Sequence, residues 1–195
     1  MKRIFDIVFA LLGLIMLSPL FIVLAIWVKV DSAGPIFYRQ IRVGRNNKDF
    51  TLLKFRSMTM DADKGSLLTV GDSDARITRS GHYIRKYKLD ELPQLINVLK
   101  GDMSFVGPRP EVRKYVDLYK AEQLHVLDVR PGITDLASIK YHNENELLKQ
   151  SQNPEEYYIH TILPDKLNIN LKYVQNHSVM NDCVIIFKTL YIITT

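Results

Sequence analysis

Cysteine is nearly absent from the sequence, because Cys183 is the only one among 195 residues. A single cysteine excludes an internal disulfide framework and a cysteine-rich metal site. The five histidines are scattered, without an HExxH motif or paired spacing, which argues against a zinc centre. Cys183 lies in an apolar stretch, so we predict that its thiol is buried and inert.

Acidic residues are scarce near the N-terminus. The first sixty positions hold 9 Lys and Arg against 3 Asp and Glu, whereas the rest of the chain holds 17 against 18. This basic excess lies beside an apolar stretch, which indicates contact with anionic lipid rather than with nucleic acid. The sequence also lacks aromatic RNA-binding motifs, zinc fingers and basic zippers, so no nucleic-acid partner is predicted.

One long stretch lacks charge in an otherwise ordinary composition of 47% hydrophobic and 24% charged residues. Residues 7–28 exceed the about 20 residues that a helix needs to cross a bilayer. Lys and Arg flank both ends, and positive residues favour the cytoplasmic side. Ser18 and Pro19 lie in the middle, where proline kinks a helix. These features leave open a kinked spanning helix and a re-entrant helix whose ends stay on one side.

The remaining periodicities predict a small hairpin and several helices in one domain. Residues 36–43 and 50–58 are β-leaning runs around a Gly-Arg-Asn-Asn-Lys turn. Helical segments are expected over residues 76–88, 91–100, 111–129 and 157–176, and a polar loop over residues 59–75. The apolar segment 184–193 is too short to span a membrane, so it either packs into the core or lies at the membrane surface.

The stretch RKYKLDELPQLINVLKGDMSFVGPRP, residues 85–110, is the most informative. It places two adjacent carboxylates, Asp90 and Glu91, at the start of the helix predicted over 91–100. Pro93 suits the first turn, and Gly101 suits the position after the last one. Asp90 has the residue type of a helix cap. A cap, however, requires neither a second acid nor the basic residues that precede it.

Two carboxylates at a helix start can approach one point, which also faces free backbone N–H groups. Such N–H groups favour a phosphate, whereas two acids repel it, so a phosphate site here needs a divalent cation and arginines. Arg109 can supply one arginine, because Pro108 and Pro110 restrict the backbone around it. The alternative is a rigid connector whose arginine meets water, and residue types alone leave both possibilities open.

The segment LDELPQLINVLKGDMSFVGPRP resembles the signature of the bacterial sugar transferases, the monotopic phosphoglycosyl transferases. The resemblance continues through FYRQIRVG, LLKFRSM and ARITRSGHYIRK upstream and through DVRPGIT downstream, so it covers nearly the whole chain. Together with the patterns above, it implies a mostly helical α+β fold. We expect a re-entrant membrane helix-break-helix over residues 1–30, broken at Ser18 and Pro19. Residues 31–195 are expected to hold the hairpin and a helical cytoplasmic catalytic domain, with an interfacial or packed C-terminal helix, as one structural unit with the anchor.

The family transfers a phosphosugar from a nucleotide-diphosphate sugar to a polyprenyl phosphate. The resemblance therefore implies a UDP-sugar donor, undecaprenyl phosphate as acceptor, release of nucleoside monophosphate and a role in a surface glycan pathway. It also implies Mg²⁺, membrane lipids as partners, and a site on the cytoplasmic face of the bacterial inner membrane. Asp90 matches the family's catalytic aspartate, which forms a covalent phosphosugar intermediate, and Glu91 would hold Mg²⁺, alone or with Asp90.

Five cationic side chains are expected to bind substrate phosphate. Lys54 and Arg56 lie in the KFRSM motif, Arg85 and Arg109 flank the carboxylates, and Arg130 lies in the RPG turn that the family associates with phosphate. The plainer interpretations are surface charges for Lys54 and Arg56, a helix-end charge for Arg85 and a bare turn at Arg130.

The chain departs from the family pattern after this turn. Asp135 stands where the family usually has glycine, and Lys140-Tyr141-His142 replaces the familiar residues before Gly-Arg. Contacts to the sugar or the base therefore cannot be transferred from the family, and the sugar, the base and the oligomeric state stay open. The alternative function is a non-enzymatic, membrane-anchored module that binds anionic lipid or a partner. That alternative explains the anchor and the basic excess, but not the paired acids.

Overall fold

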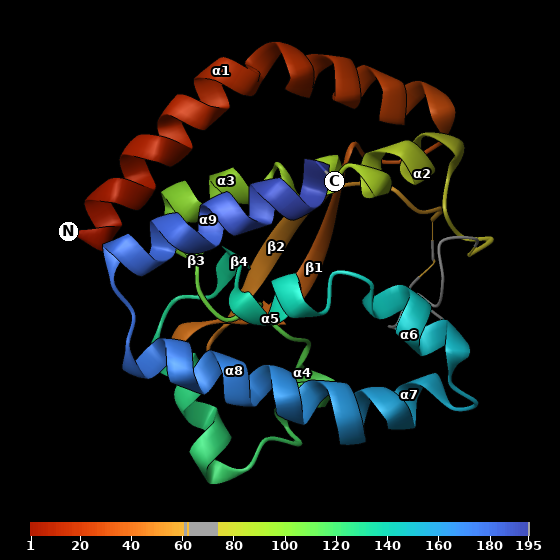
Figure 1. Cartoon of the computed structure of the whole chain (residues 1–195). Helices are drawn as coiled ribbons and strands as arrows, with labels where there is room; N and C mark the ends of the chain where they lie inside the picture. Colours follow the sequence, from red (N-terminus) through yellow and green to blue (C-terminus); the bar gives the residue numbers. More distant parts are fainter. Residues whose placement is uncertain (61, 63–73, 195) are drawn as a thin grey trace.

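The computed structural model describes residues 1–60, 62 and 74–194, and its helices form two layers with a β-hairpin between them (Figure 1). The upper layer contains α1 (Lys2–Asp31), α2 (Arg79–Lys86), α3 (Gln94–Lys100) and α9 (Val179–Thr194). The lower layer contains α4 (Arg113–Val116), η4 (Ala121–Asp128), α6 (Glu144–Gln150), α7 (Pro154–Tyr157), η5 (Tyr158–Ile162) and α8 (Leu163–Gln175). The mostly helical α+β class is confirmed. Most of the loop predicted over 59–75 lies outside the described residues.

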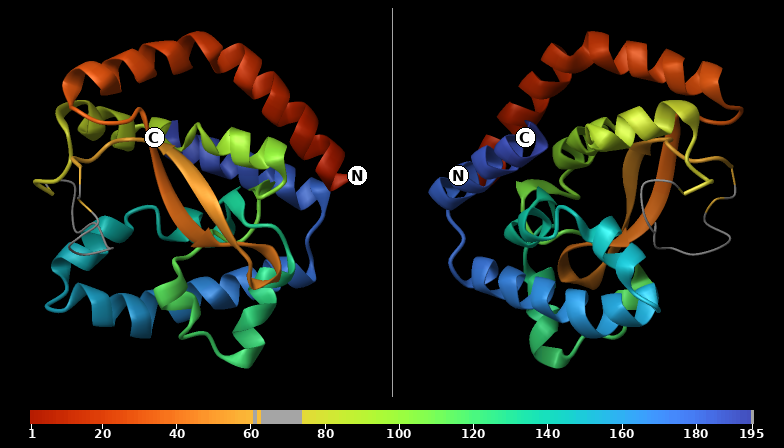
Figure 2. Two further views of the ribbon diagram at one scale, coloured as in Figure 1. Left: turned by 180° about the vertical axis from the view of Figure 1, so that it is seen from behind. Right: turned by 45° about the vertical axis from the view of Figure 1, so that its right-hand side comes forward.

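The predicted hairpin is present and joins the two layers. Strand β1 (Phe37–Val43) pairs antiparallel with β2 (Asp49–Phe55), with Phe37 opposite Phe55. The turn η1 (Arg45–Asn47) contains two asparagines, Asn46 and Asn47, at φ 56° and 59°. Asparagine tolerates this left-handed region better than most residues do, so the turn chemistry suits the sequence. Seen from behind, the hairpin crosses the open face of the molecule (Figure 2).

Helix α1 is long and apolar, as predicted, and it arches over α3 and α2 with a bend near its middle (Figure 1). Pro19 lies inside the helix, and the Ser18 hydroxyl donates to the Ile15 carbonyl at 2.8 Å. The segment is one bent helix rather than two helices separated by a break, because the proline deletes only one backbone bond. Its exposed apolar residues are Ile4, Ile7, Val8, Phe9, Leu11, Leu12, Ile15, Met16, Ile22, Val23, Ile26, Trp27 and Val30. The re-entrant path stays a prediction.

The N-terminal half of α1 is fastened to the rest of the fold by polar contacts. Lys2 Nζ forms an ion pair with the buried Asp182 of α9. The buried Asp6 carboxylate accepts hydrogen bonds from the Ser104 hydroxyl (3.0 Å) and the Phe105 N–H (3.2 Å). Ser104 and Phe105 begin the strand that leads to Arg109. The start of α1 therefore holds a strand of the candidate site.

The C-terminal half of α1 packs on the other side of the same body. Leu24 and Val28 are buried against Phe55 of β2 and Ile84 of α2. Asp31, the last residue of α1, accepts from both the N–H and the hydroxyl of Ser80, each at 2.8 Å. Both ends of α1 are thus attached to one folded unit.

A second strand pair was not predicted from the sequence. Strand β3 (Ser104–Val106) runs parallel to β4 (Gly132–Thr134). A Cβ on Gly132 would lie 2.1 Å from the Gly107 nitrogen, so only glycine permits this approach. Three-residue strands carry too little periodicity to be recognised. The pair brings Gly-Pro-Arg-Pro next to the segment that begins α5 (Leu136–Lys140).

Two helix predictions need correction. Residues 111–129 form the short α4 and the 3₁₀ helix η4 rather than one surface helix. The helix expected over 157–176 is present, but it includes a π-helical turn, η5. Pro164 follows this turn and cannot donate to the carbonyl of His160, which favours the wider winding.

Helix α9 packs into the core along one side, and its placement at a membrane surface stays a prediction. Ile185 is buried against Val106 and Tyr173, whereas Met180 and Phe187 are 75% and 72% exposed. Cys183 is half-buried, so the prediction of a buried thiol was too strong.

Candidate functional site

A cavity of about 860 Å³ opens between the hairpin, η3 (Leu89–Glu91) and the lower helical layer. This volume falls within the range of small-molecule sites. Its described charged lining residues are the cations Arg39, Arg42, Lys54, Arg56, Arg85, Arg109 and Lys166 and the acids Asp90, Glu111 and Glu144. Cations outnumber acids, which suits an anionic ligand.

Asp90 is buried at the wall of this cavity, with 5% of its surface exposed. Lys88 adopts the left-handed conformation (φ 54°), which ends α2 and turns the chain into η3. The Asp90 side chain caps no helix, and its buried Oδ1 has no hydrogen-bond partner among the described residues. The helix-cap interpretation is therefore wrong. A buried, unpaired carboxylate oxygen is costly, and such groups concentrate at functional sites.

The surroundings of Asp90 favour its protonated form. Desolvation raises the pKa of Asp90, the positive charge of Lys54 opposes this shift, and the like charge of Glu91 adds to it. The net effect is a pKa above the ordinary value for aspartate. The Asp90 carboxylate is consequently less solvated than a surface carboxylate and more reactive when ionised.

Glu91 is held by two cations. Its Oε1 lies 3.2 Å from Lys54 Nζ, and Arg109 binds both carboxylate oxygens, with Nη1 at 3.1 Å from Oε2. Burial alone would raise the pKa of Glu91, but the charges of Arg109 and Lys54 outweigh burial and hold that pKa well below its usual range. Desolvation lowers the pKa of Lys54 despite the opposing charge of Glu91. Lys54 and Arg109 line the cavity, so Glu91 fixes two cations at its wall.

Arg109 is positioned through its backbone as well as its side chain. Its N–H donates to Asp135 Oδ2 at 2.7 Å, and the same carboxylate accepts from the Ser138 N–H at the start of α5. Asp135 thus ties the Gly-Pro-Arg-Pro segment to α5. Sequence reasoning had noted this aspartate only as a departure from the family glycine. An Asp before Leu-Ala-Ser is a helix-cap signal, so the capping of α5 could have been predicted, but not the bond to Arg109.

Arg85 projects from the last turn of α2 to the cavity wall. Its guanidinium makes no hydrogen bond or ion pair with any residue that the structure describes. Its charge nonetheless lowers the pKa of Asp90. The structure therefore brings Lys54, Arg85 and Arg109 to the predicted carboxylates.

Two predicted phosphate ligands have other partners. Arg56 is buried and donates to the carbonyls of Val28 (3.2 Å) and Ser32 (2.6 Å), so its guanidinium closes the C-terminal end of α1. Arg130 Nε donates to the Gly101 carbonyl at 2.8 Å, at the end of α3 remote from Asp90. Guanidinium groups satisfy unpaired helix carbonyls well, and the motif alone did not reveal this role.

The cavity lining also contains a network of ion pairs that the sequence did not predict. Arg42 Nη1 lies 3.5 Å from Glu111, whose other oxygen accepts from the Tyr158 hydroxyl. Lys166 Nζ pairs with Glu144 at 2.8 Å. These residues are far apart in sequence, so no spacing could connect them. Their charges cancel in pairs, and this region is therefore polar but locally neutral.

Asp90 and Glu91 are the ligand type that Mg²⁺ prefers, but they are too few to form a complete metal site. No cluster of three or more His, Cys, Asp or Glu side chains suited to a metal occurs within the described ranges. Mg²⁺ is commonly held by one or two carboxylates together with substrate phosphates. Asp90 offers an unpaired oxygen, and Glu91 lies next to it in the chain. Asp90 therefore fits a magnesium ion whose other ligands come from substrate and water, whereas both Glu91 oxygens already accept from Lys54 or Arg109.

The fold and the site define an α+β protein with a long apolar N-terminal helix and a cation-lined cavity around a desolvated aspartate. The model of the family described as bacterial sugar transferase matches residues 1–195, and the chain belongs to this family.

Curated relatives extend over all or nearly all of the chain. It is 38% identical over 197 residues to an Aeromonas hydrophila protein named UDP-N-acetylgalactosamine-undecaprenyl-phosphate N-acetylgalactosaminephosphotransferase, covering 100% of this chain and 44% of the relative. It is 37% identical to the UDP-glucose:undecaprenyl-phosphate glucose-1-phosphate transferase of Klebsiella pneumoniae, covering 97% and 39%. The exopolysaccharide production protein ExoY of Sinorhizobium fredii is 36% identical, with 97% and 83% covered. The chain thus spans less than half the length of the first two relatives.

The position of Arg56 predicts a structural role. We expect Arg56→Ala to lower the midpoint of thermal unfolding in detergent by about 5–10 °C, because loss of the guanidinium leaves helix carbonyls unpaired at a cost of about 2–3 kcal/mol. Arg113→Ala removes a more exposed arginine and serves as the control, with a shift of about 2 °C or less. An unchanged midpoint for Arg56→Ala would return Arg56 to the candidates for phosphate binding.

Proposed function

We propose that this protein transfers a phosphosugar from a UDP-sugar to undecaprenyl phosphate and releases uridine monophosphate. The observation that carries the proposal is the buried, unpaired Asp90 carboxylate at a cavity wall with Lys54, Arg85 and Arg109. Family membership and the names of the relatives supply the substrate classes. The reaction would begin the membrane stage of a bacterial surface glycan.

The chemistry proceeds in two displacements at one phosphorus atom. An Asp90 oxygen attacks the phosphorus that bears the sugar, and the bond to the nucleoside monophosphate breaks, so that the nucleotide leaves with the bonding electrons. This step leaves an acyl phosphate on Asp90. An oxygen of the lipid phosphate then attacks the same phosphorus, and the Asp90 carboxylate departs. The products are a polyprenyl-diphosphate sugar and the regenerated enzyme.

Three cations stabilise the charge that moves during these displacements. Lys54 and Arg109 are already fixed by Glu91, so they require little reorganisation when a phosphate arrives. Arg85 faces the cavity without a described partner, which leaves its guanidinium available to phosphate oxygens. Mg²⁺, held by Glu91 alone or with Asp90, would screen the diphosphate and the leaving phosphate when bound.

The cavity divides by charge in a way that fits the donor. The lining around Asp90 is cationic, whereas elsewhere in the lining Arg42 pairs with Glu111 and Lys166 pairs with Glu144, which makes this second part the neutral side. We assign the diphosphate to the cationic wall and an uncharged part of the donor, sugar or nucleoside, to the neutral side. Ion-paired side chains and the Tyr158 hydroxyl offer hydrogen bonds there without attracting phosphate.

The arrangement of α1 supports a re-entrant anchor. Lys2 and Asp6 attach its first half to the body, and Leu24, Val28 and Asp31 attach its second half. A helix attached at both ends to one folded unit keeps both flanks on one membrane face, and the basic flanks favour the cytoplasmic one. The exposed apolar surface would then enter one leaflet. This placement brings the cavity to the level at which a lipid phosphate lies.

The substrate assignment is tested by a screen of nucleotide sugars with undecaprenyl phosphate, Mg²⁺ and the full chain. We expect one or a few UDP-sugars to yield uridine monophosphate and a lipid-linked diphosphate sugar. Release of nucleoside diphosphate instead would indicate an ordinary glycosyl transferase. Inactivity with every donor, for folded protein in membranes, would favour the non-enzymatic anchored module.

Asp90→Asn tests the nucleophile. The amide cannot form the acyl phosphate, so we expect a loss of about 10³-fold or more in turnover with an unchanged unfolding midpoint. Asp128→Asn, at an exposed position in η4, is the matched control and should retain full activity. Intact-mass analysis of wild-type enzyme trapped with donor should show one added phosphosugar, absent from Asp90→Asn. Product formation without that adduct at any time would overturn the covalent mechanism.

Arg85→Gln tests the electrostatics of Asp90 through pH dependence. Asp90 attacks as a carboxylate, so kcat/KM falls as the pH drops through its pKa, which desolvation already raises above the ordinary aspartate value. Removal of the Arg85 charge raises that pKa further. We therefore expect the acidic limb of the profile to move to higher pH. Arg85→Lys keeps the charge and should leave the acidic limb near its wild-type position. An unchanged limb in Arg85→Gln would contradict the assignment of this limb to Asp90.

Pro19→Ala tests the bend of α1. Restoring the deleted backbone bond favours a straighter helix, which strains the contacts at both ends and misplaces the site relative to the lipid. A misplacement of about 1 Å can cost about 10²-fold in rate, so we expect a loss of about 10- to 100-fold in membranes. Labelling of cysteines introduced at either flank reports their side of the bilayer. Full activity with the two flanks on opposite faces would exclude the re-entrant anchor.

A further inference from the structure

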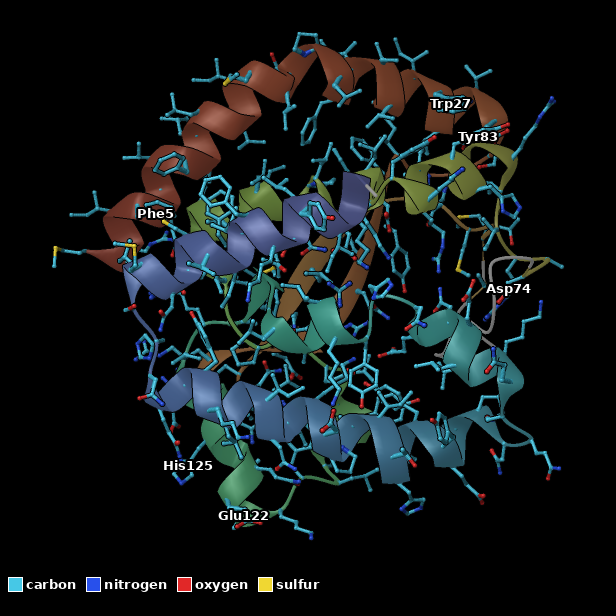
Figure 3. The ribbon with its side chains drawn as sticks, in the orientation of Figure 1. Phe5, Trp27, Asp74, Tyr83, Glu122 and His125 are labelled. Atoms are coloured by element: carbon cyan, nitrogen blue, oxygen red, sulfur yellow. The ribbon has the colours of Figure 1, made fainter. Side chains whose placement is uncertain are left out.

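The corner where α1 meets α2 carries a surface that the transfer reaction does not use. Trp27 of α1 and Tyr83 of α2 face one another on the outside of the molecule, with ring centroids 5.9 Å apart (Figure 3). Tyr83 and Tyr87 are 57% and 52% exposed, and Lys86 Nζ lies 5.6 Å from the Tyr87 ring centroid. We call this set, with the exposed Arg79, the α2 surface.

The orientation of α2 fixes this surface outward. Ser80, Gly81 and Ile84 form the buried side of the helix. A Cβ on Gly81 would lie 2.0 Å from the Ser57 carbonyl oxygen. Helix α2 therefore approaches the backbone at Ser57 more closely than any residue other than glycine would allow. The bonds from Ser80 to Asp31 prevent rotation about the helix axis. Aromatic and cationic side chains are therefore held on one exposed side.

The α2 surface is positively charged in its described surroundings. Arg79 and Lys86 are exposed, and Lys29 lies at the nearby end of α1 with its Nζ 3.1 Å from the Gly34 carbonyl. Asp31 is the acid at this corner, and its carboxylate is occupied by Ser80. Cations beside aromatic rings suit a partner that is anionic and partly apolar.

The apolar surface of α1 is continuous with this corner. Val30, about one turn from Trp27, is 81% exposed, and Ile26, next to Trp27 in the chain, is 59% exposed. Trp and Tyr prefer the boundary between headgroups and acyl chains, and Lys and Arg near that boundary attract anionic lipids. We propose that the α2 surface binds the headgroups of anionic phospholipids of the bilayer. Continuity with α1 favours lipid over any soluble polyanion.

This contact would set the depth of the active site. Arg85 leaves the opposite side of α2 for the cavity, and Asp90 follows α2 by four residues. A bilayer contact on the outer side of α2 places the cavity mouth at the headgroup level, where an acceptor phosphate lies. The inference rests on the membrane position in the proposed function, but not on its chemistry.

Trp27 is the only tryptophan in the chain, so its fluorescence reports this corner directly. The full chain is reconstituted in phosphatidylcholine vesicles that contain no polyprenyl phosphate. A small fraction of brominated lipid is added, with either a phosphatidylglycerol or a phosphatidylcholine headgroup and identical brominated chains. We expect phosphatidylglycerol to quench Trp27 about twice as strongly, because it accumulates at the α2 surface. Salt at 0.5 M should reduce the difference.

Arg79→Gln/Lys86→Gln removes two cations from the α2 surface and should abolish the headgroup preference while quenching by phosphatidylcholine persists. The matched control is Lys149→Gln/Lys172→Gln, which removes two exposed cations from the lower layer and should keep the preference. Equal quenching by both lipids in the wild type, or a preference that survives Arg79→Gln/Lys86→Gln, would overturn the proposal. No substrate enters this measurement, so its failure is distinguishable from failure of the transfer reaction.

Discussion

The ion-paired triad of Lys54, Glu91 and Arg109 is the interaction on which the site depends. Two cations in a partly dry cavity would repel one another and be unstable, and one carboxylate between them removes that penalty. Asp90 Oδ1, in contrast, has no hydrogen-bond partner among the described residues. The triad keeps one net positive charge beside this acid, an arrangement that the proposed reaction would use to stabilise a transferring phosphate.

Packing under α1 extends this constraint to the long apolar helix. Asp6 binds the start of β3, and the chain reaches Arg109 three residues after β3 ends. At the other end of α1, Arg56 donates to the Ser32 carbonyl, and Lys54 lies two residues before Arg56 in the chain. Arg109 and Lys54 are therefore each connected, through neighbouring residues of the chain, to a different end of α1. A displacement of either half of α1 would therefore move one of the two cations that bind Glu91.

The sequence predicted the local features well, because they depend on near neighbours. The hairpin and the helix after Pro93 with its Gly101 terminus follow from strong local signals. The meeting of Asp90 with Lys54, Arg85 and Arg109 was expected from the family resemblance. The β3–β4 pair and the contacts of Glu111 and Glu144 join distant segments, which periodicity does not connect. Arg56 and Arg130 show a further limit, since an arginine serves equally for phosphates and for helix carbonyls.

Asp135 illustrates how a family site accommodates change. A glycine has no side chain to accept from the Arg109 N–H, whereas this chain supplies a carboxylate that also caps α5. Helix α5 in turn leads to α6, which carries Glu144 to the neutral side of the cavity. Asp135 thus joins Arg109, at the wall near Asp90, to the helices that carry Glu144. Variation directly after β4 can therefore affect both parts of the cavity, because this aspartate holds the backbone of Arg109 and begins α5.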